Sequence, residues 1–369
     1  MKRLILAGGG HAHLHVLKAL AVAPWPGVEV VLVSPYRRQI YSGMVPGWMA
    51  GHYRLDQCAA ALEPLARTAG VRFVQDHVTA IDANTRQLHT SQSGSFSYDF
   101  LSLDTGAGID TSLLVATGAR LLNIRPLENF VVDWNRLLDT CHQRGQIRLT
   151  VVGGGAAGVE LTLAARHRLA AELGAAKTSV SLVAGADLLP GHGTGIVARV
   201  GRILETQRIA LIRSHAAGAP GGLQLSDGCL IETDFVIAAT GVRPASWLAG
   251  TGLALASDGF IAVGSGQHSI SHPEVFAAGD VASRIDAPHA KSGVYAVRAG
   301  PVLALNLQRA LQGQSPLAYQ PQKRSLYLLA TGPRYAIMSW GSFCAGGRWA
   351  WSWKDWIDRR FMRQYATQQ

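Results

Sequence analysis

The sequence predicts an α/β protein with two dinucleotide-binding domains and a C-terminal extension. Three features predict it: two apolar segments that each run into a glycine-rich turn, a helical pattern after each turn, and further short apolar segments of buried-strand type between and after them. The turns begin at Gly8 and Gly153. A repeated strand–turn–helix unit is much stronger evidence for nucleotide binding than one glycine motif.

The first unit opens with a predicted strand at residues 4–7 and continues in a helix from His11 to Ala21. Gly8 permits a sharp turn, Gly10 lets the backbone approach a pyrophosphate, and the new helix presents unpaired N–H groups to that anion. The motif is imperfect, because His13 stands at the third glycine position. Ser34 also follows the second strand, residues 28–33, where an acidic ribose ligand is usual.

The second unit has a predicted strand at residues 147–152 and a helix to about Leu173. Its turn carries all three glycines, at Gly153, Gly155 and Gly158, and Glu160 follows directly. We therefore expect two bound dinucleotides, or one dinucleotide and a second nucleotide.

Composition narrows the class of protein. The 369 residues suit two to three domains, and 48% apolar content excludes a disordered chain or a fibre. A net charge of +10 suits nucleic acid, an anionic membrane or a phosphate-bearing cofactor. The four scattered cysteines argue against a disulfide framework or a thiolate zinc site. No apolar run is long enough to cross a bilayer. Since scattered thiols also suit a reducing compartment, we expect a soluble or peripheral cytoplasmic protein.

A metal site is the alternative reading of three histidines near the first turn, of which His11 and His15 share a helix face. Side chains at such a helix start usually pack or donate to a phosphate, so we expect no metal.

Three further segments are predicted strands that end in a turn with small or acidic residues. They are residues 99–106, ending in Thr105 and Gly106, residues 234–241, ending in Thr240 and Gly241, and residues 275–282, containing Gly279 and Asp280.

In this order the motifs resemble the two-dinucleotide-binding flavoproteins of the pyridine nucleotide–disulfide oxidoreductase family, with a glutathione-reductase-like pair of Rossmann-like domains. The resemblance covers nearly all of residues 1–330. Within the family the sequence is similar to type II NADH dehydrogenases, and more so to the NADH-dehydrogenase-like module that is found alone or fused ahead of selenide, water dikinase. The segments GGGHAHLHVL, YSGMVPG and WKDWIDRRFM carry this likeness.

The resemblance implies FAD on the first unit, NADH or NADPH on the second, and Asp280 at the ribityl chain of FAD. The residues expected to bind FAD are Gly8, Gly10, His11, Ala12, Ser34, Ser42, Gly43, Met44, Val78, Thr105, Gly106, Gly279, Asp280, Ser292 and Gly293. Those expected to bind the nicotinamide nucleotide are Gly153, Gly155, Ala156, Ala157, Gly158 and Gly241.

Two residues are expected to be catalytic. By the resemblance, Glu160 lies close to nicotinamide and flavin. The alternative is that Glu160 is a carboxylate in the first turn of its helix, where it interacts favourably with the positive end of the helix dipole. Lys291 precedes a helix whose N-terminus would face the flavin and stabilise its reduced anion. The alternative for Lys291 is a solvated loop lysine.

The family motifs do not identify the molecule that accepts electrons from the flavin. Residues 40–47 lack the CxxxxC pair of the disulfide reductases, so the acceptor must meet the flavin directly or through a thiol that the sequence does not reveal. The quinone-site segment AQxAxQ corresponds to residues 293–298, where both glutamines are absent. Strand 179–183 ends in Ala184-Gly185, which does not separate NADH from NADPH. We expect an NAD(P)H dehydrogenase with a quinone-like acceptor; the alternatives are an oxidoreductase of small sulfur or selenium compounds and a non-enzymatic redox sensor.

The expected domains are residues 1–115 and 255–330 for FAD, with a β-meander at roughly 71–103, residues 120–250 for NAD(P)H, which the chain would enter through Arg125-Pro126, and residues 326–369 as the extension. Four tryptophans fall within eight residues of that tail: Trp349, Trp351, Trp353 and Trp356. As a basic aromatic helix, residues 349–363 could lie on the inner face of an anionic membrane, or pack on the flavin domain or a second subunit. One face of this helix would be aromatic and apolar and the opposite face largely charged: Trp349, Trp353, Trp356, Ile357 and Phe361 against Lys354, Asp355, Asp358, Arg359 and Arg363. No nucleic-acid-binding motif accompanies it.

Overall fold

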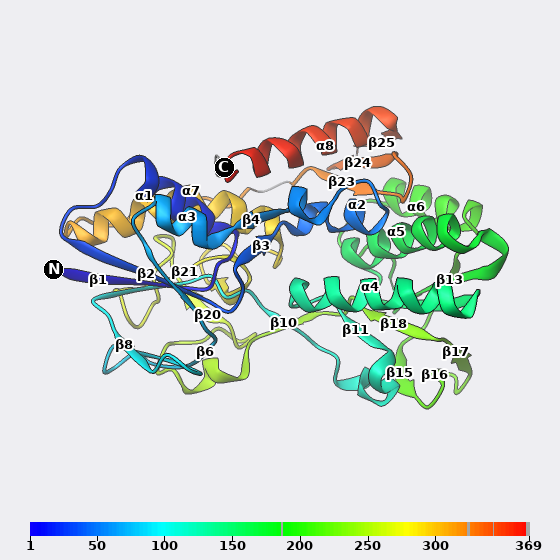
Figure 1. Ribbon diagram of the computed structural model, residues 1–369, viewed down its shortest axis with the longest axis horizontal. Helices are drawn as coiled ribbons and strands as arrows, with labels where there is room; N and C mark the ends of the chain where they lie inside the picture. The colour runs from blue at the N-terminus through cyan, green and yellow to red at the C-terminus, as the bar shows by residue number, and fades with distance from the viewer. Residues whose placement is uncertain (186, 323–324, 342, 367–369) are drawn as a thin grey trace.

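The computed structural model describes residues 1–369 except 186, 323–324, 342 and 367–369. Figure 1 shows two α/β halves side by side, with the C-terminal helix lying across both. The N-terminal half carries a parallel sheet of five strands in the order β21-β9-β1-β2-β5. These strands are β21 (Val275–Ala277), β9 (Phe100–Leu103), β1 (Lys2–Ala7), β2 (Val28–Ser34) and β5 (Arg72–Gln75).

Helices α1 (His11–Val22), α3 (Leu62–Thr68) and α7 (Gly293–Leu311) cover one face of this sheet. The other face meets an antiparallel meander of β6 (Val78–Asp82), β7 (Gln87–Thr90) and β8 (Ser95–Ser97). The meander is therefore shorter than predicted, because residues 72–75 and 100–103 pair within the parallel sheet. Their parallel partners, β2 and β1, fix them there.

The second half repeats the arrangement with a parallel sheet in the order β11-β18-β12-β13-β14. Its strands are β11 (Leu121–Asn123), β18 (Phe235–Ala238), β12 (Ile147–Val152), β13 (Thr178–Ala184) and β14 (Ala210–Arg213). Helices α4 (Leu127–Arg144), α5 (Ala156–Leu173) and α6 (Thr194–Thr206) pack on it. A second meander follows, made of β15 (Ala216–Ala219), β16 (Gly222–Leu225) and β17 (Leu230–Glu232).

Short elements connect the halves and shape the site. The chain crosses between the halves through the antiparallel pair β10 (Gly108–Ile109) and β19 (Val242–Arg243). The remaining short elements are β3 (Arg38–Ile40), η1 (Ser42–Met44), α2 (Val45–Met49), η2 (Leu55–Cys58), β4 (Ala59–Ala61), η3 (Ser112–Arg120), η4 (Ala175–Lys177), η5 (Ser246–Gly250), β20 (Ile261–Val263), η6 (Gly279–Val281) and β22 (Ala282–Arg284).

The tail forms the antiparallel strands β23 (Tyr327–Ala330), β24 (Ala336–Trp340) and β25 (Phe343–Gly347), and then α8 (Arg348–Arg363). Helix α8 turns its charged face inward and most of its aromatic face outward: Asp358 is 3% exposed, whereas Trp349 and Trp356 are about half exposed. Phe361, expected on the aromatic face, is instead buried against the N-terminal half. Among the described residues, no helix combines the length and apolarity needed to cross a membrane.

Candidate active site

The first glycine turn joins β1 to α1 and is held by the end of β9. Gly8 has a φ of +94°, and a Cβ there would collide with the backbone of Asp104. A Cβ on Gly10 would collide with the Asp104 carboxyl group. Both positions therefore require glycine, and both are closed on one side by Asp104.

Asp104 is a site residue that the sequence analysis missed. Its Oδ2 accepts hydrogen bonds from the amides of Ala12 (2.7 Å) and His13 (3.0 Å), so the carboxyl group caps the start of α1. Burial raises the pKa of Asp104 to about 7, against the effect of these two bonds. The available signal was a comparison of the two strand ends: the position of Asp104 before Thr105-Gly106 is held by Ala239 before Thr240-Gly241.

His13 takes the place of the missing third glycine. Its Nδ1 lies 2.6 Å from the carbonyl oxygen of Gly8, and its Nε2 lies 2.8 Å from the hydroxyl of Ser102. Because a carbonyl only accepts, Nδ1 carries the proton and Nε2 accepts from Ser102. Burial lowers the pKa of His11 and of His13 to about 4, so both rings are neutral at pH 7.

His11 begins the helix, and its Nε2 is buried with no hydrogen-bond partner among the described residues. The amides of residues 9–11 likewise have no acceptor within the described part of the chain. The turn therefore keeps donors and a free polar atom for a ligand, which fits a diphosphate-bearing cofactor. No group of three or more His, Cys, Asp or Glu side chains that could hold a metal occurs among the described residues.

Asp280 lies on η6, directly after β21, and Gly279 has a φ of +71°. The Nη1 of Arg125 donates to Oδ2 of Asp280 at 2.6 Å. Arg125 precedes α4 at the entry to the second half, so this ion pair connects the two halves at the predicted flavin site. Sequence analysis named Arg125 only as a point of entry, because nothing in its local sequence indicates the partner. A Cβ on Gly279 would lie 2.7 Å from Oδ1 of Asp104, so the two carboxyl groups are neighbours.

The second turn joins β12 to α5, and Gly155 is its N-cap. Gly153 has a φ of +135°, and a Cβ there would collide with the carbonyl of Ala239. A Cβ on Gly158 would collide with the carbonyl of Gly153. Ala156 and Ala157 form the first helical turn, and the Gly241 carbonyl accepts from the amide of Asp110 on the crossing segment.

Several of the predicted FAD ligands gather near the N-terminus of α7. Ser292 caps α7 by accepting from the amide of Val294, and the Ser42 hydroxyl lies 3.0 Å from the Cβ position of Gly293. Ser42, Gly43 and Met44 form η1. Thr105 and Gly106 follow β9, and Gly106 has a φ of +74°.

Two predicted FAD ligands lie elsewhere on the sheet. Ser34 ends β2, where its hydroxyl donates to the carbonyl of Tyr36. Val78 starts β6 and packs, half-buried, on the meander side of the sheet, opposite α1. The FAD contacts of all these residues remain predictions.

Lys291 is engaged by its own loop. Its Nζ donates to the carbonyl of Ala282 (2.5 Å) and the hydroxyl of Ser283 (2.7 Å), and lies 3.7 Å from the Asp258 carboxylate. The ammonium also lies 3.9 Å from the centre of the Phe260 ring. With its donors occupied, Lys291 is better placed to position the segment before α7 than to contact a reacting atom.

Glu160 belongs to a buried cluster formed by three distant segments. Its Oε1 accepts from the amide of Ala330 on β23 at 2.8 Å. Burial raises the pKa of Glu160 to about 7, although the charge of Lys354 opposes the shift. Lys354, on α8, donates to the carbonyl of Gly43 (2.7 Å) and to Asp358 (2.9 Å).

The pKa of Lys354 is lowered by burial but raised more by Asp358 and Glu160, so the ammonium stays charged. Burial raises the pKa of Asp358 as well, against its bonds to Lys354. One buried cation thus faces two buried carboxyl groups, and one of the two can hold a proton near neutral pH. Lys354 and Asp358 were expected on the polar side of the tail helix, and nothing in the sequence indicated that this side is buried at the site.

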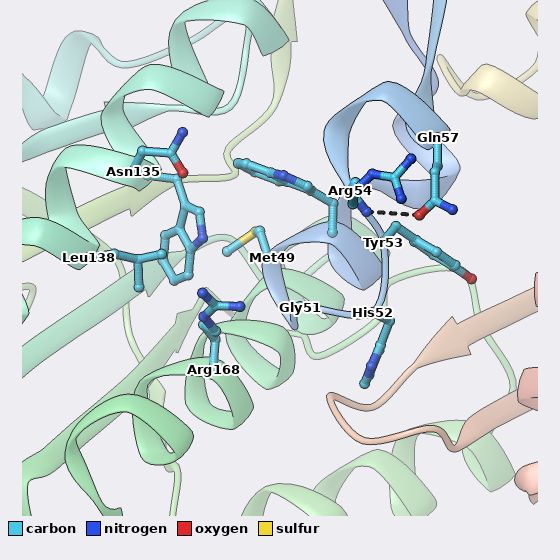
Figure 2. Close-up of a pocket in the computed structure, with 11 residues that line it drawn as sticks. Met49, Gly51, His52, Tyr53, Arg54, Gln57, Asn135, Leu138 and Arg168 are labelled. Carbon is cyan, nitrogen blue, oxygen red and sulfur yellow. Dashed lines mark hydrogen bonds between the residues drawn. The ribbon is translucent and has the colours of Figure 1, made fainter.

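A cavity of about 320 Å³ lies outside both turns, between α2, η2, α4 and α5 (Figure 2). Its wall includes Arg54 and Arg168, and the amide of Arg54 donates to Gln57, as Figure 2 shows. Both cations already have carboxylate partners, at 2.8 Å from Asp56 and from Glu172. The cavity therefore offers no free positive charge to an anionic ligand.

Two glycine turns in parallel sheets and a carboxylate between the halves define a class of protein, an oxidoreductase with two nucleotide sites. Residues 2–300 match the pyridine nucleotide-disulphide oxidoreductase family, and the chain belongs to this family. It is an enzyme of that family, with FAD as its cofactor and NADH or NADPH as co-substrate. The sequence predictions of fold class, family and cofactors are confirmed.

Relatives of known sequence include proteins named as dehydrogenase-like and as reductases. An NADH dehydrogenase-like protein of Mycobacterium tuberculosis is 29% identical over 322 residues, which cover 78% of this chain and 75% of the relative. The ferredoxin–NAD(+) reductase component of the biphenyl dioxygenase system of Paraburkholderia xenovorans is 31% identical over 56% of this chain and 49% of its own. Demethylphylloquinone reductase of Synechocystis is 29% identical over 45% of this chain and 43% of its own.

Solved structures share the fold over nearly the whole chain. NDH2 from Plasmodium falciparum, in complex with NADH, has a TM-score of 0.84 at 13% identity and covers 99% of this chain and 97% of its own. Sulfide:quinone oxidoreductase from Aquifex aeolicus has a TM-score of 0.81 at 16% identity, and the match covers 99% of this chain and 91% of that structure. At these identities the likeness establishes the fold alone.

Proposed function

We propose that the protein is an FAD-dependent NAD(P)H dehydrogenase that delivers electrons from the flavin to a small quinone-like acceptor without an intervening disulfide. When bound, FAD supplies the hydride-accepting and electron-donating chemistry. The glycine turns and Asp280 would hold and orient the two nucleotides.

The observation that carries this proposal is the buried cluster of Glu160, Lys354 and Asp358. Reduction of a quinone to a quinol consumes two protons as well as two electrons, so such an enzyme needs a group that exchanges protons near pH 7. Glu160 has this property because its pKa is about 7. Lys354 bonds the carbonyl of Gly43, which places the cluster against the segment predicted to contact FAD.

The cysteines support transfer without a disulfide. All four are free thiols, and η1 with its flanks contains none of them. Burial raises the pKa of Cys58 to about 12 and that of Cys141 to about 11, so both remain protonated and poorly nucleophilic. This disfavours the alternative oxidoreductase of small sulfur or selenium compounds in the form that relies on Cys58.

The outward face of α8 supports an acceptor drawn from a membrane. Trp349, Trp353 and Trp356 are 51%, 39% and 50% exposed, and Arg360 stacks on Trp356. Tryptophan and arginine are enriched where a helix lies at a lipid surface. We propose that this face rests on an anionic membrane surface and that the protein is peripheral there; a second subunit is the alternative occupant.

The test is anaerobic reduction of the purified flavoprotein by NADH and NADPH, followed by reoxidation with soluble quinones and with oxidised sulfur and selenium compounds. We expect nicotinamide to reduce the flavin and quinones to reoxidise it over many turnovers. Reduction by sulfide or selenide without nicotinamide would favour the chalcogen enzyme. Negligible turnover with every acceptor would favour the redox sensor and refute the proposal.

A further inference from the structure

The strand ends that close the two glycine turns of this chain carry different residues, Asp104 in the first unit and Ala239 in the second. In the second unit, Ala239 ends β18 and its backbone closes the turn at Gly153. In the first unit, Asp104 closes the turn at Gly8 in the same way, but adds a carboxyl group. Among the described residues, no side chain accepts from the first amides of the second helix, α5, whereas the Asp104 carboxyl caps α1 through the amides of Ala12 and His13.

This carboxyl group stands where the first turn must receive an anion. The diphosphate of FAD carries two negative charges, and a helix start is the normal place for them. Asp104 already accepts from two amides of that helix start and is 4% exposed. The amides of residues 9–11 lie beside it on the same turn, so a diphosphate bound there would be its immediate neighbour.

The surrounding charges make an ionised Asp104 unfavourable once a diphosphate arrives. Asp280 on η6 is a second carboxyl group next to it, and Arg125 is already paired with Asp280. On α1, both His11 and His13 are neutral, since burial lowers the pKa of each to about 4.

Two more titratable groups precede α7, and neither compensates Asp104. Lys291 is held by Ala282, Ser283 and Asp258, and burial lowers the pKa of His289. The carboxylates of Asp104 and Asp280 and the diphosphate would therefore share one guanidinium, that of Arg125, in a buried site. Like charges this close together disfavour the ionised form of Asp104.

We propose that Asp104 is a cofactor-binding residue that must hold a proton when FAD occupies the first turn, so that FAD binding takes up a proton. The protonated carboxyl still accepts from Ala12 and His13 through one oxygen. Its other oxygen gains an O–H that can donate a hydrogen bond. The capped helix start then presents a donor to the cofactor instead of a negative charge.

The geometry gives the expected pH dependence. Burial raises the pKa of Asp104 to about 7 in the chain without cofactor, and the diphosphate raises it further in the loaded protein. Between these two values the Kd for FAD rises by up to about tenfold per pH unit. The diphosphate does not titrate in this range, nor do His11 and His13, whose pKa values burial lowers to about 4.

The test measures FAD release from the diluted holoprotein by the fluorescence of free FAD, from pH 6 to pH 8.5. We expect the Kd to rise roughly 10- to 30-fold across this range in the wild type. In Asp104→Asn, which cannot ionise, we expect a change below about threefold. Asp82→Asn is the matched control, because Asp82 also accepts from two amides, those of Asn84 (3.0 Å) and Thr85 (3.1 Å), but it lies on the meander away from both turns and should keep the wild-type pH dependence.

A second measurement needs no variant. Mixing FAD with the full chain stripped of flavin, in weak buffer with an indicator dye, should take up about 0.7 proton per FAD at pH 7.5 and about 0.1 at pH 6. No proton uptake, a flat wild-type Kd, or an unchanged slope in Asp104→Asn would each overturn the role of Asp104. The inference rests on the proposed flavin cofactor, but the two fail differently: a chain that binds no FAD at any pH contradicts the proposed function, whereas pH-independent binding contradicts only this inference.

Discussion

Replacing Lys354 by methionine should destabilise the protein strongly, and by an amount that depends on pH. Lys354 and Asp358 have side chains only 13% and 5% exposed, and their charged atoms are 2.9 Å apart. Removing one partner of a buried ion pair costs about 3–5 kcal/mol, because the other charge is left without compensation. Gly43 also loses the donor to its carbonyl group.

The pH dependence follows from the two carboxyl groups. Burial raises the folded-state pKa of Glu160 and of Asp358, so each is protonated at little cost at low pH. For each group, the free energy of unfolding falls as the pH rises from the pKa in the unfolded chain towards the raised pKa in the folded protein. The fall is up to about 1.4 kcal/mol per pH unit and group. Without Lys354 both folded values rise further, so Lys354→Met should cost less at pH 5 than at pH 8.

The assay is urea unfolding of the FAD-saturated protein, followed by tryptophan fluorescence at pH 5 and pH 8. Adding Asp358→Leu to Lys354→Met removes both charges and should recover most of the loss. Lys18→Met is the control: Lys18 is a partly exposed lysine whose ammonium donates to Gln364 in a solvent-exposed hydrogen bond, and its loss should cost below about 0.5 kcal/mol. A cost below about 1 kcal/mol for Lys354→Met, or a double variant no more stable than the single one, would refute the description of the cluster.

Three further changes test the site and the outer face of α8. Glu160→Gln should slow reoxidation by quinone roughly 100-fold and remove the step near pH 7 from the pH–rate profile, as stopped-flow absorbance would reveal; an unchanged profile would exclude Glu160 as the proton-exchanging group. Arg125→Gln leaves Asp280 without its cation, so the Kd for FAD should rise about 10- to 100-fold. Fluorescence titration measures this Kd, and an unchanged Kd would mean that the ion pair is not part of the flavin site. Replacing Trp353 and Trp356 by serine should abolish co-sedimentation with anionic vesicles while leaving turnover of a soluble quinone within about twofold; retained sedimentation would refute a membrane-facing role.

Local sequence was sufficient for the two nucleotide units. The glycines at residues 8, 10, 153 and 158 stand where the backbone of a neighbouring strand end or turn, or an adjacent carboxyl group, leaves no room for a side chain. Such a turn can be predicted from its own few residues, and the strand before it and the helix after it can be predicted from their local patterns. The family and its cofactors followed from the order of these motifs.

The residues that sequence analysis missed have partners far away in the chain. Lys354 bonds a carbonyl group 311 residues away, Arg125 pairs with a carboxylate 155 residues away, and Asp104 caps a helix 92 residues away. The periodicity of the tail separated a charged from an aromatic face, but periodicity does not say which face is buried. That depends on Gly43 and Glu160, which are brought together only by the tertiary fold.

Helix α8 has a mechanical consequence. Near its end Phe361 and Met362 are embedded in the core of the N-terminal half, and in its middle Lys354 is tied to Gly43 and acts on Glu160 of the other half (Figure 1). Because α8 interacts with both halves, we expect it to restrict any opening between them. Undocking of the helix would then change the relative motion of the halves and the surroundings of Glu160 together.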